Sequence, residues 1–282
     1  MKVLDPVRQL SCGRFTLSLD RPLLMGIVNV TPDSFSDGGQ FASAAQAIEH
    51  ARRLVDDGAD LLDIGGESTR PGAEPVSPQQ ELDRTGPVLE GLLDCGRPLS
   101  VDTRRPEVMR AALALGADMI NDIAALRTPG AIDAVAGSRC AVCLMHMLGE
   151  PSTMQQAPVY QEVVSDVEAF LQDRIEAAQA AGIARERIVI DPGIGFGKTT
   201  RHNLTLLGAL DEFAALGQPL LLGVSRKSLI GALTGRDAAQ QRLAGSLAAA
   251  LAGVARGAAI LRVHDVAATR DALRVWQAID EA

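Results

Sequence analysis

Short runs of apolar residues alternate along this chain with longer stretches in which apolar residues recur every three or four positions. The runs have the length of buried strands, and the longer stretches have the period of helices that cover a sheet. From residue 23 onward, the pattern predicts eight successive strand–helix pairs. The predicted strands are residues 23–30, 61–64, 98–101, 119–120, 141–145, 188–190, 219–224 and 259–263, and the predicted helices are 43–57, 78–93, 106–115, 130–136, 161–181, 203–216, 238–256 and 267–279.

Strands that alternate with helices pair in parallel, because each helix returns the chain to the end where the next strand begins. Eight such units in about 250 residues predict an α/β fold, the closed (β/α)8 TIM barrel. An open, doubly wound sheet is the alternative. Residues 15–19 and 23–30 flank Asp20-Arg21-Pro22, which predicts a short N-terminal β-hairpin. Ser43 is expected to cap the first helix. No long polar linker divides the chain, so we expect residues 1–282 to form one domain.

Composition and charge narrow the classes of function. The chain has 282 residues, 47% of them hydrophobic, which is enough for a sizeable core. Its formal net charge of −8 argues against a general nucleic-acid or acidic membrane surface. A small anionic ligand remains possible, because a few clustered basic residues are enough to bind one. We therefore expect small-molecule partners and neither nucleic acid nor membrane.

The four cysteines do not form the pattern of a disulfide framework. Cys140 and Cys143 lie in one apolar run, and residues three apart on a strand face opposite sides, so this pair should not hold a metal or form a disulfide. Free cysteines are typical of a reducing compartment. No signal peptide is visible, and the longest apolar stretch, residues 243–255, is too short to span a bilayer. A cytoplasmic protein is the prediction.

A polar residue follows nearly every predicted strand. In a barrel these strand ends lie on one face, and that face carries the site. Each polar residue alone has an ordinary explanation as a turn or helix-capping residue. Eight in succession, with histidine and lysine among them, indicate a polar pocket. The strand ends are Asn29, Asp63, Asp102, Asn121, His146, Asp191, Ser225 with Lys227, and His264.

These residue types point to two kinds of ligand. Arginine, lysine and histidine near the last two strands are typical of a phosphate site, and the basic residues expected at the mouth are Arg70, Arg226, Lys227, Arg262 and His264. Alternatively, Arg70 or Arg226 forms an ion pair with a neighbouring acid. Buried carboxylates at Asp102 and Asp191 require donors, which a heterocycle with adjacent N–H groups would supply. His146 has no second ligand at zinc spacing and is predicted to be a hydrogen-bonded core residue.

The stretch 188–198, IVIDPGIGFGK, combines a strand, one carboxylate and a glycine-rich loop. Its Gly197-Lys198-Thr199 ending resembles a phosphate-binding loop of nucleotide triphosphatases. That motif needs a glycine five positions before the one that precedes the lysine, and Pro192 stands there. We therefore interpret Asp191 as the functional residue of this stretch and Lys198 as a residue that supports the loop.

Several motifs of this chain, taken in order from residue 26 to 266, resemble those of the dihydropteroate synthases of bacterial folate synthesis. They are GIVNVTPDSFSDGG, DIGGESTRPGA, SVDTRRPEV, INDI, LMHM, DPGIGFGK, GVSRKSLIG and RVHDV. The resemblance implies a (β/α)8 barrel that joins 6-hydroxymethyl-7,8-dihydropterin diphosphate to 4-aminobenzoate. The expected products are 7,8-dihydropteroate and pyrophosphate. Assistance by Mg²⁺, a homodimer formed through the late helices and inhibition by sulfonamides are also implied.

The resemblance also assigns roles to residues at matching motif positions. Catalytic roles are implied for Asp102, Lys227, Arg262 and His264. The implied pterin-binding residues are Asp102, Asn121, Met145, Asp191, Gly223 and Lys227. The implied pyrophosphate-binding residues are Asn29, Arg70, Arg262 and His264, and Asn29 is the implied metal ligand. The implied 4-aminobenzoate-binding residues are Phe35, Thr69, Arg70, Pro71, Phe196 and Ser228.

Two related alternatives share these features in part. A pterin-dependent methyltransferase would use the same barrel and carboxylate pocket, but it would not need Arg262 or the Ser225-Arg226-Lys227-Ser228 loop for pyrophosphate. A paralogue that binds pterin without turnover would keep the same pocket. The intact sequences 29–39 and 68–72 favour an active enzyme.

Overall fold

The structure is a computed structural model that describes residues 6–30, 39–68 and 76–282, with the backbone alone for residues 39–43. Eight strands close into a barrel in the hydrogen-bonded order β10-β3-β4-β5-β6-β7-β8-β9. All neighbouring pairs in it are parallel, which confirms the predicted fold class and excludes the open sheet. The strands are β3 (Leu23–Asn29), β4 (Leu61–Gly65), β5 (Leu99–Asp102), β6 (Met119–Asp122), β7 (Ala141–Met145), β8 (Ile188–Asp191), β9 (Leu220–Leu222) and β10 (Ala258–Val263).

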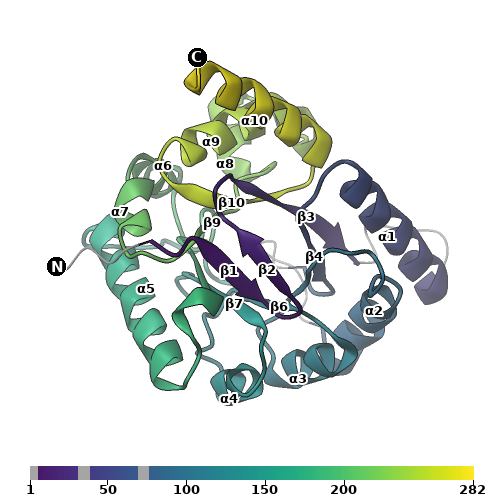
Figure 1. Ribbon diagram of the computed structural model, residues 1–282. Helices are drawn as coiled ribbons and strands as arrows, with labels where there is room; N and C mark the ends of the chain where they lie inside the picture. Colours follow the sequence, from purple (N-terminus) through teal and green to yellow (C-terminus); the bar gives the residue numbers. More distant parts are fainter. Residues whose placement is uncertain (1–5, 31–38, 69–75) are drawn as a thin grey trace.

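Helices form an outer ring around these strands (Figure 1). Most lie where the sequence predicts them, but three differ. The first begins at Gly39, before the expected cap Ser43; the predicted helix 203–216 is two helices; and Ser228–Thr234 is a helix too short for a periodic pattern to reveal. The helices are α1 (Gly39–Asp56), α2 (Pro78–Glu90), α3 (Pro106–Leu115), α4 (Ala131–Ala136), α5 (Val163–Ala180), α6 (Thr200–Gly208), α7 (Leu210–Ala214), α8 (Ser228–Thr234), α9 (Leu243–Val254) and α10 (Val266–Asp280).

The N-terminal hairpin is present, but its strands are not the predicted pair. β1 (Gln9–Cys12) pairs antiparallel with β2 (Phe15–Ser18), whereas residues 23–29 form the first barrel strand. The turn between β1 and β2 is possible because Gly13 adopts a φ of +59°. The fully apolar run of β3 is typical of a strand buried on both faces. The hairpin lies across one end of the barrel (Figure 1).

The barrel interior is filled by alternate residues of the strands, because successive side chains of a strand point to opposite faces. One contiguous apolar cluster occupies the interior below the mouth. Leu10 and Cys12 of the hairpin belong to that cluster, so β1 plugs the end at which the strands begin. The remaining buried members are Leu23, Met25, Leu61, Met119, Ala141, Cys143, Val189, Leu221 and Ile260.

The expectation that Cys140 and Cys143 face opposite sides of their strand is confirmed. Cys143 lies inside the barrel, whereas Cys140 belongs to the larger apolar cluster between strands and helices. All four cysteines are free thiols. Within the described ranges, every helix falls short of the length and apolarity that crossing a bilayer requires.

Asp118, at the start of β6, joins the hairpin to the barrel. Its buried carboxylate accepts hydrogen bonds from the backbone N–H and the guanidinium of Arg14, at 2.8–3.0 Å. It also accepts from the N–H of Leu99 at 3.1 Å. A Cβ at Gly13 would lie 2.5 Å from the Asp118 Oδ1, so only glycine permits this approach. One carboxylate therefore holds the plug in place.

We predict that Asp118→Ala lowers the free energy of unfolding by about 2 kcal/mol, because the change leaves the buried N–H of Leu99 without an acceptor and removes the ion pair with the partly exposed Arg14. Urea denaturation followed by circular dichroism measures it. The control is Asp94→Ala, which removes the exposed partner of Arg52 and should change stability by less than about 1 kcal/mol. Equal effects of the two substitutions would contradict the anchoring role of Asp118.

Candidate functional site

The polar mouth of the barrel follows from the same two-residue period that fills its interior. Moving two residues along a strand from the apolar layer leads to the next side chain that faces inward. In five strands that residue was predicted from the sequence, either as a strand-end residue or as a site residue. The pairs are Leu61 and Asp63, Met119 and Asn121, Val189 and Asp191, Leu221 and Gly223, and Ile260 and Arg262.

Asp63 is the centre of this polar layer. It is fully buried, and its Oδ2 accepts from Nε of Arg262 at 2.6 Å and from Nδ2 of Asn121 at 3.0 Å. Its Oδ1 accepts from the hydroxyl of Ser100 at 2.6 Å. The sequence predicted Asp63 as a strand-end residue but gave it no role in binding. The available signal was its position in β4, the strand that pairs with the one carrying Asp102. Both of these carboxylates bind Arg262.

Arg262 bridges two carboxylates across the mouth. Besides Asp63, it donates from Nη2 to Oδ2 of Asp102 at 2.9 Å. Burial would lower the pKa of Arg262, but the two carboxylates outweigh it and raise that pKa. Burial and the nearby charge of Asp63 raise the pKa of Asp102 to about 7, although Arg262 acts in the opposite direction. Within the described part of the chain, the Nη1 of Arg262 has no hydrogen-bond partner.

Asp191 and Lys227 lie close to each other beside Gly223, which also neighbours Arg262. A Cβ at Gly223 would lie 3.7 Å from Nζ of Lys227 and 4.0 Å from Oδ2 of Asp191, so the glycine leaves open space between them. The Oδ1 of Asp191 accepts from the N–H of Gly193 at 2.7 Å. Burial raises the pKa of Asp191, and burial lowers the pKa of Lys227 to about 8 despite the neighbouring carboxylate. The structure therefore brings the predicted pterin residues together.

Three of the four predicted pyrophosphate residues, Asn29, Arg262 and His264, lie at the ends of β3 and β10. The Ser225 hydroxyl lies 3.0 Å from Nδ1 of His264 and accepts from the backbone N–H of His264 at 3.2 Å. Asn29 pairs in register with Gly65, which pairs in turn with Asp102, so these three strands end at one level. A Cβ at Gly65 would meet the Asn29 Oδ1 at 3.8 Å and the Asp102 Oδ2 at 3.9 Å.

The remaining predicted site residues lie in different places. Met145 and Phe196 share a small apolar cluster beside the mouth, and Ser228 is the exposed first residue of α8. Arg226 follows the ion-pair alternative, since its guanidinium binds both oxygens of Asp265. The residues that lie outside the described part of the chain are Phe35, Thr69, Arg70 and Pro71.

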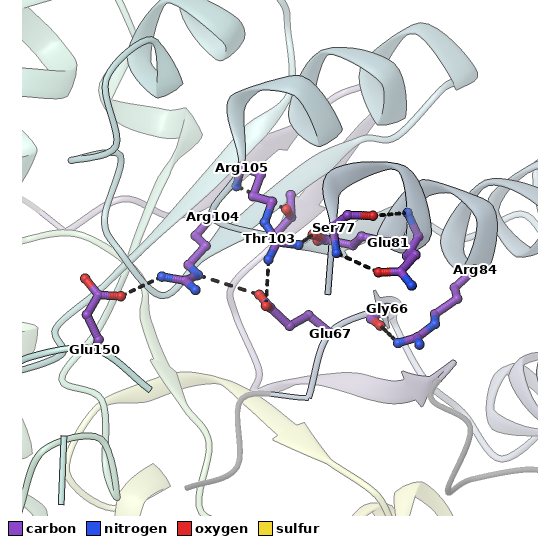
Figure 2. Close-up of polar contacts among 10 residues, drawn as sticks. Gly66, Glu67, Ser77, Glu81, Arg84, Thr103, Arg104, Arg105 and Glu150 are labelled. Atoms are coloured by element: carbon purple, nitrogen blue, oxygen red, sulfur yellow. Dashed lines mark hydrogen bonds and ion pairs between the residues drawn. The ribbon is translucent and has the colours of Figure 1, made fainter. Parts of the chain in front are cut away.

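A second charged network, which the sequence did not predict, joins three strand ends beside the mouth (Figure 2). Glu67, after β4, forms ion pairs with Arg105 at 2.8 Å and with Arg104 at 3.6 Å. Arg105 also binds Glu81 of α2, and Arg104 binds Glu150 in the loop after β7. Burial raises the pKa of Glu81. The adjacent arginines Arg104 and Arg105, which follow Asp102 after one threonine, were the visible signal, and the network holds the segment that carries Asp102.

The glycine-rich loop after β8 does not have the arrangement of a nucleotide phosphate loop. Lys198 is buried, and its ammonium contacts His146 and the backbone carbonyls of Gly193 and Phe196. The helix that follows begins only after Thr199, whose side chain caps it. The expectations for Lys198 as a loop-supporting residue and for His146 as a hydrogen-bonded core residue are both confirmed.

The site is compatible with a divalent cation that a ligand brings with it. Among the described residues, no three histidine, cysteine, aspartate or glutamate side chains are grouped to hold a metal. Mg²⁺ keeps several waters and is bound largely through substrate phosphates, so it does not require such a group. The Asn29 amide oxygen is a suitable oxygen ligand at the mouth.

A barrel of this kind, with buried carboxylates, a lysine and an ion-paired arginine at its mouth, belongs to the class of pterin-binding enzymes: the family model "Pterin binding enzyme" matches residues 25–264. The chain is 56% identical to the dihydropteroate synthase of Neisseria meningitidis serogroup C over 271 residues, which cover 95% of this chain and 96% of the relative. The chain belongs to the pterin-binding enzyme family and, within it, to the dihydropteroate synthases, which are transferases.

Solved structures agree. The Xanthomonas albilineans dihydropteroate synthase with 4-aminobenzoic acid has a TM-score of 0.93 and 57% identity, covering 98% of this chain and 99% of that chain. The same enzyme in complex with 7,8-dihydropteroate has a TM-score of 0.87 and 51% identity, with the same coverage. The resemblance in the sequence motifs is therefore confirmed over nearly the whole chain.

We predict that Asp191→Asn stabilises the ligand-free protein at neutral pH. Burial raises the pKa of Asp191 in the folded protein above its value in the unfolded chain. At a pH above the folded pKa, the buried charge therefore lowers the free energy of unfolding. At a pH below the unfolded pKa, the carboxyl is neutral in both states and this cost is absent. The asparagine oxygen can still accept from Gly193. Thermal unfolding should show a gain of about 2–4 °C at pH 8, and a smaller gain at pH 4.

The control for this prediction is Asp237→Asn at an exposed position. It should leave the melting temperature within about 1 °C at both pH values, since surface substitutions change stability little. An equal gain in melting temperature for Asp191→Asn at pH 4 and pH 8 would contradict this explanation, because it would show that the gain does not come from removing a buried charge.

Proposed function

We propose that this chain catalyses the dihydropteroate synthase reaction with the pterin held at Asp191 and the diphosphate leaving from the side of Arg262. The observation that carries the proposal is the division of the mouth: an acid–lysine pair on one side and a carboxylate-bound arginine on the other, with Gly223 leaving space between them. Pterin and 4-aminobenzoate are the expected small-molecule ligands.

On the pterin side, Asp191 is suited to accept hydrogen bonds from parallel N–H groups of the ring. Lys227 and Asn121 are suited to donate to ring nitrogen or oxygen atoms. Asp102 extends the carboxylate edge toward Arg262, and Met145 supplies an apolar wall for a flat ring. Charged hydrogen bonds in a buried pocket are strong, which favours selection of this heterocycle.

On the diphosphate side, the leaving group gains negative charge as its bond to the pterin methylene breaks. The Nη1 of Arg262 and the ring of His264 are suited to hold that charge, since Asp63 and Asp102 fix the arginine and Ser225 fixes the histidine. Asn29 would bind Mg²⁺ together with the diphosphate. The ion, when bound, supplies further neutralisation of the leaving group.

The second substrate is an aromatic amine, which is uncharged and nucleophilic at neutral pH. We propose that it approaches beside Phe196, with its carboxylate toward Ser228 at the start of α8. No strong general base is needed for the attack, so stabilisation of the leaving group is the main task of the site. Roles for Phe35, Thr69, Arg70 and Pro71 remain proposals from the motif match.

The proposal predicts different failures for two variants. Incubation with the pterin diphosphate, 4-aminobenzoate and Mg²⁺ should yield 7,8-dihydropteroate and pyrophosphate. Asp191→Asn should weaken pterin binding about tenfold to a hundredfold, because a charged acceptor is lost. Arg262→Ala should lower kcat by about a hundredfold or more, because the growing charge of the leaving group loses a donor. Steady-state kinetics and equilibrium binding of 7,8-dihydropteroate separate the two effects.

Arg256→Ala is the control, since the hydrogen bond that this surface arginine makes to the described residues is to the carbonyl of Ala252 in α9. Unchanged turnover in Arg262→Ala would count against its proposed role. Pterin binding without any product from the unaltered protein would support the non-catalytic paralogue. Transfer of a methyl group, without dependence on the diphosphate, would support the methyltransferase alternative.

We also propose a cytoplasmic homodimer in which each chain is one domain. The free thiols of all four cysteines support the location. Helix α10 lies beside α9 (Figure 1). Val275 and Ile279 lie one turn apart on α10 and are 61% and 72% exposed. Such neighbouring apolar side chains are typical of a protein interface.

We predict that replacing both Val275 and Ile279 with glutamate converts a dimer to a monomer, because charge at the centre of an apolar interface is desolvated without a partner. Size-exclusion chromatography with light scattering measures the change. Leu204→Glu, on the exposed face of α6, is the control and should leave the dimer intact. A monomeric mass for the unaltered protein would contradict the dimer.

A further inference from the structure

Lys198 is a buried lysine whose hydrogen-bond partners, among the described residues, are a histidine ring and backbone carbonyls, with no ion-paired carboxylate. Its side chain is 3% exposed. The Nζ lies 2.9 Å from Nδ1 of His146 and donates to the carbonyls of Gly193 and Phe196, each at 3.0 Å. A lysine ammonium has three N–H donors, and three close acceptors surround this one. A buried charge satisfied in this way fixes the groups that accept from it.

The partner His146 is itself held in one state. It is 6% exposed, and burial together with the positive charge of Lys198 lowers its pKa to about 3. Beside a protonated Lys198, which can only donate, the neutral ring accepts at Nδ1 and carries its proton on Nε2. The ring packs edge-on against Phe170 with centroids 4.8 Å apart. The acceptor for Lys198 is thus anchored at the end of β7.

The loop held by Lys198 lies directly on the end of β7. Gly193 has a φ of +69°, and a Cβ there would lie 1.9 Å from the carbonyl oxygen of His146. Gly195 accepts from Gln155 at 2.6 Å and donates to Asn203 at 2.7 Å, and Gly197 accepts from Tyr160 at 2.8 Å. The backbone of residues 193–197 is therefore fixed from several elements, with Lys198 at the centre.

The other side of this loop contacts the pterin residues of the mouth. The carbonyl of Ile194 accepts from Nζ of Lys227, and the Phe196 ring lies 4.8 Å from the same nitrogen. The N–H of Gly193 donates to Asp191. The loop atoms that make these three contacts belong to residues 193–196, within the segment that Lys198 holds.

We propose that Lys198, with His146 as its anchored acceptor, is a positioning residue for the pterin half of the site. Lys198 does not touch the ligand. It fixes the Gly193 N–H, the Ile194 carbonyl and the Phe196 ring, and these place the Asp191 carboxylate and the Lys227 ammonium. The proposal rests on the pterin site proposed above. It does not involve Arg262, which receives no contact from this loop among the described residues.

The test is selective loss of affinity in Lys198→Met, which keeps the length of the side chain and removes its donors. Binding of 7,8-dihydropteroate should weaken at least tenfold, and KM for the pterin diphosphate should rise similarly. Binding of inorganic pyrophosphate with Mg²⁺, measured by calorimetry, should stay within twofold. Retention of pterin affinity within twofold, or equal losses of pterin and pyrophosphate affinity, would overturn the proposal.

The matched control is Arg187→Met. Arg187 also donates to buried backbone carbonyls, those of Cys140 and Val135, but at the opposite end of the barrel strands. It should lower the melting temperature and leave both affinities within twofold. A general loss of stability therefore cannot imitate the selective effect expected of Lys198→Met.

Two substitutions at His146 keep the proposal testable if Lys198→Met does not fold. His146→Phe removes the acceptor and keeps an aromatic ring, and it should weaken pterin binding in the same selective way. His146→Asn supplies a side-chain oxygen for Lys198 and should restore affinity to within about threefold. Equal pterin affinity in the phenylalanine and asparagine variants would overturn the proposal.

Asp191→Asn separates this proposal from the proposed site. If Asp191→Asn keeps full pterin affinity, the assignment of the pterin site is wrong. If Asp191→Asn loses pterin affinity and Lys198→Met keeps it, the site stands and the positioning role of Lys198 is wrong.

Discussion

The ion pair between Asp63 and Arg262 is the constraint on which the mouth of the barrel depends. A fully buried carboxylate is unfavourable unless donors surround it, and Arg262, Asn121 and Ser100 supply them from three other strands. Because the same guanidinium also binds Asp102, the side chains of four strands fix one another. Arg262 thus has a set orientation before any ligand arrives, which is the condition for stabilising charge as it develops.

The barrel below this polar layer is closed and filled with apolar side chains. The apolar cluster inside the strands ends at the plug formed by Leu10 and Cys12. Asp118 secures that plug at one end of β6, while Asn121 at the other end of the same strand binds Asp63. Charges in such a low-dielectric setting interact strongly, so the same burial that raises the pKa of Asp102 and Asp191 also strengthens their contacts with a ligand.

The sequence predicted the barrel, and the strand ends as the place of the site, because both follow from the spacing of apolar and polar residues within single strands and helices. Alternation places Asp63, Asn121, Asp191 and Arg262 on the inner face wherever the preceding apolar residue is inward. Features that depend on long-range pairing were not accessible. β2 was assigned to the wrong partner because both neighbours were plausible strands, and the choice rests on contacts between β1 and the barrel end. The links of Arg104 and Arg105 to Glu67 and Glu81 likewise join separate elements.

The glycine-rich loop after β8 illustrates how partners, rather than residue type, decide the role of a lysine. Lys198 and Lys227 hold the same loop from two sides, and burial lowers the pKa of both. Lys198 is surrounded by carbonyls and a neutral imidazole, so its N–H donors bind and fix the backbone of the loop. Lys227 faces a carboxylate across the space beside Gly223, so its donors are directed where a ligand can lie. The residue that looked like a phosphate-loop lysine is therefore structural, and the lysine in the next loop belongs to the site.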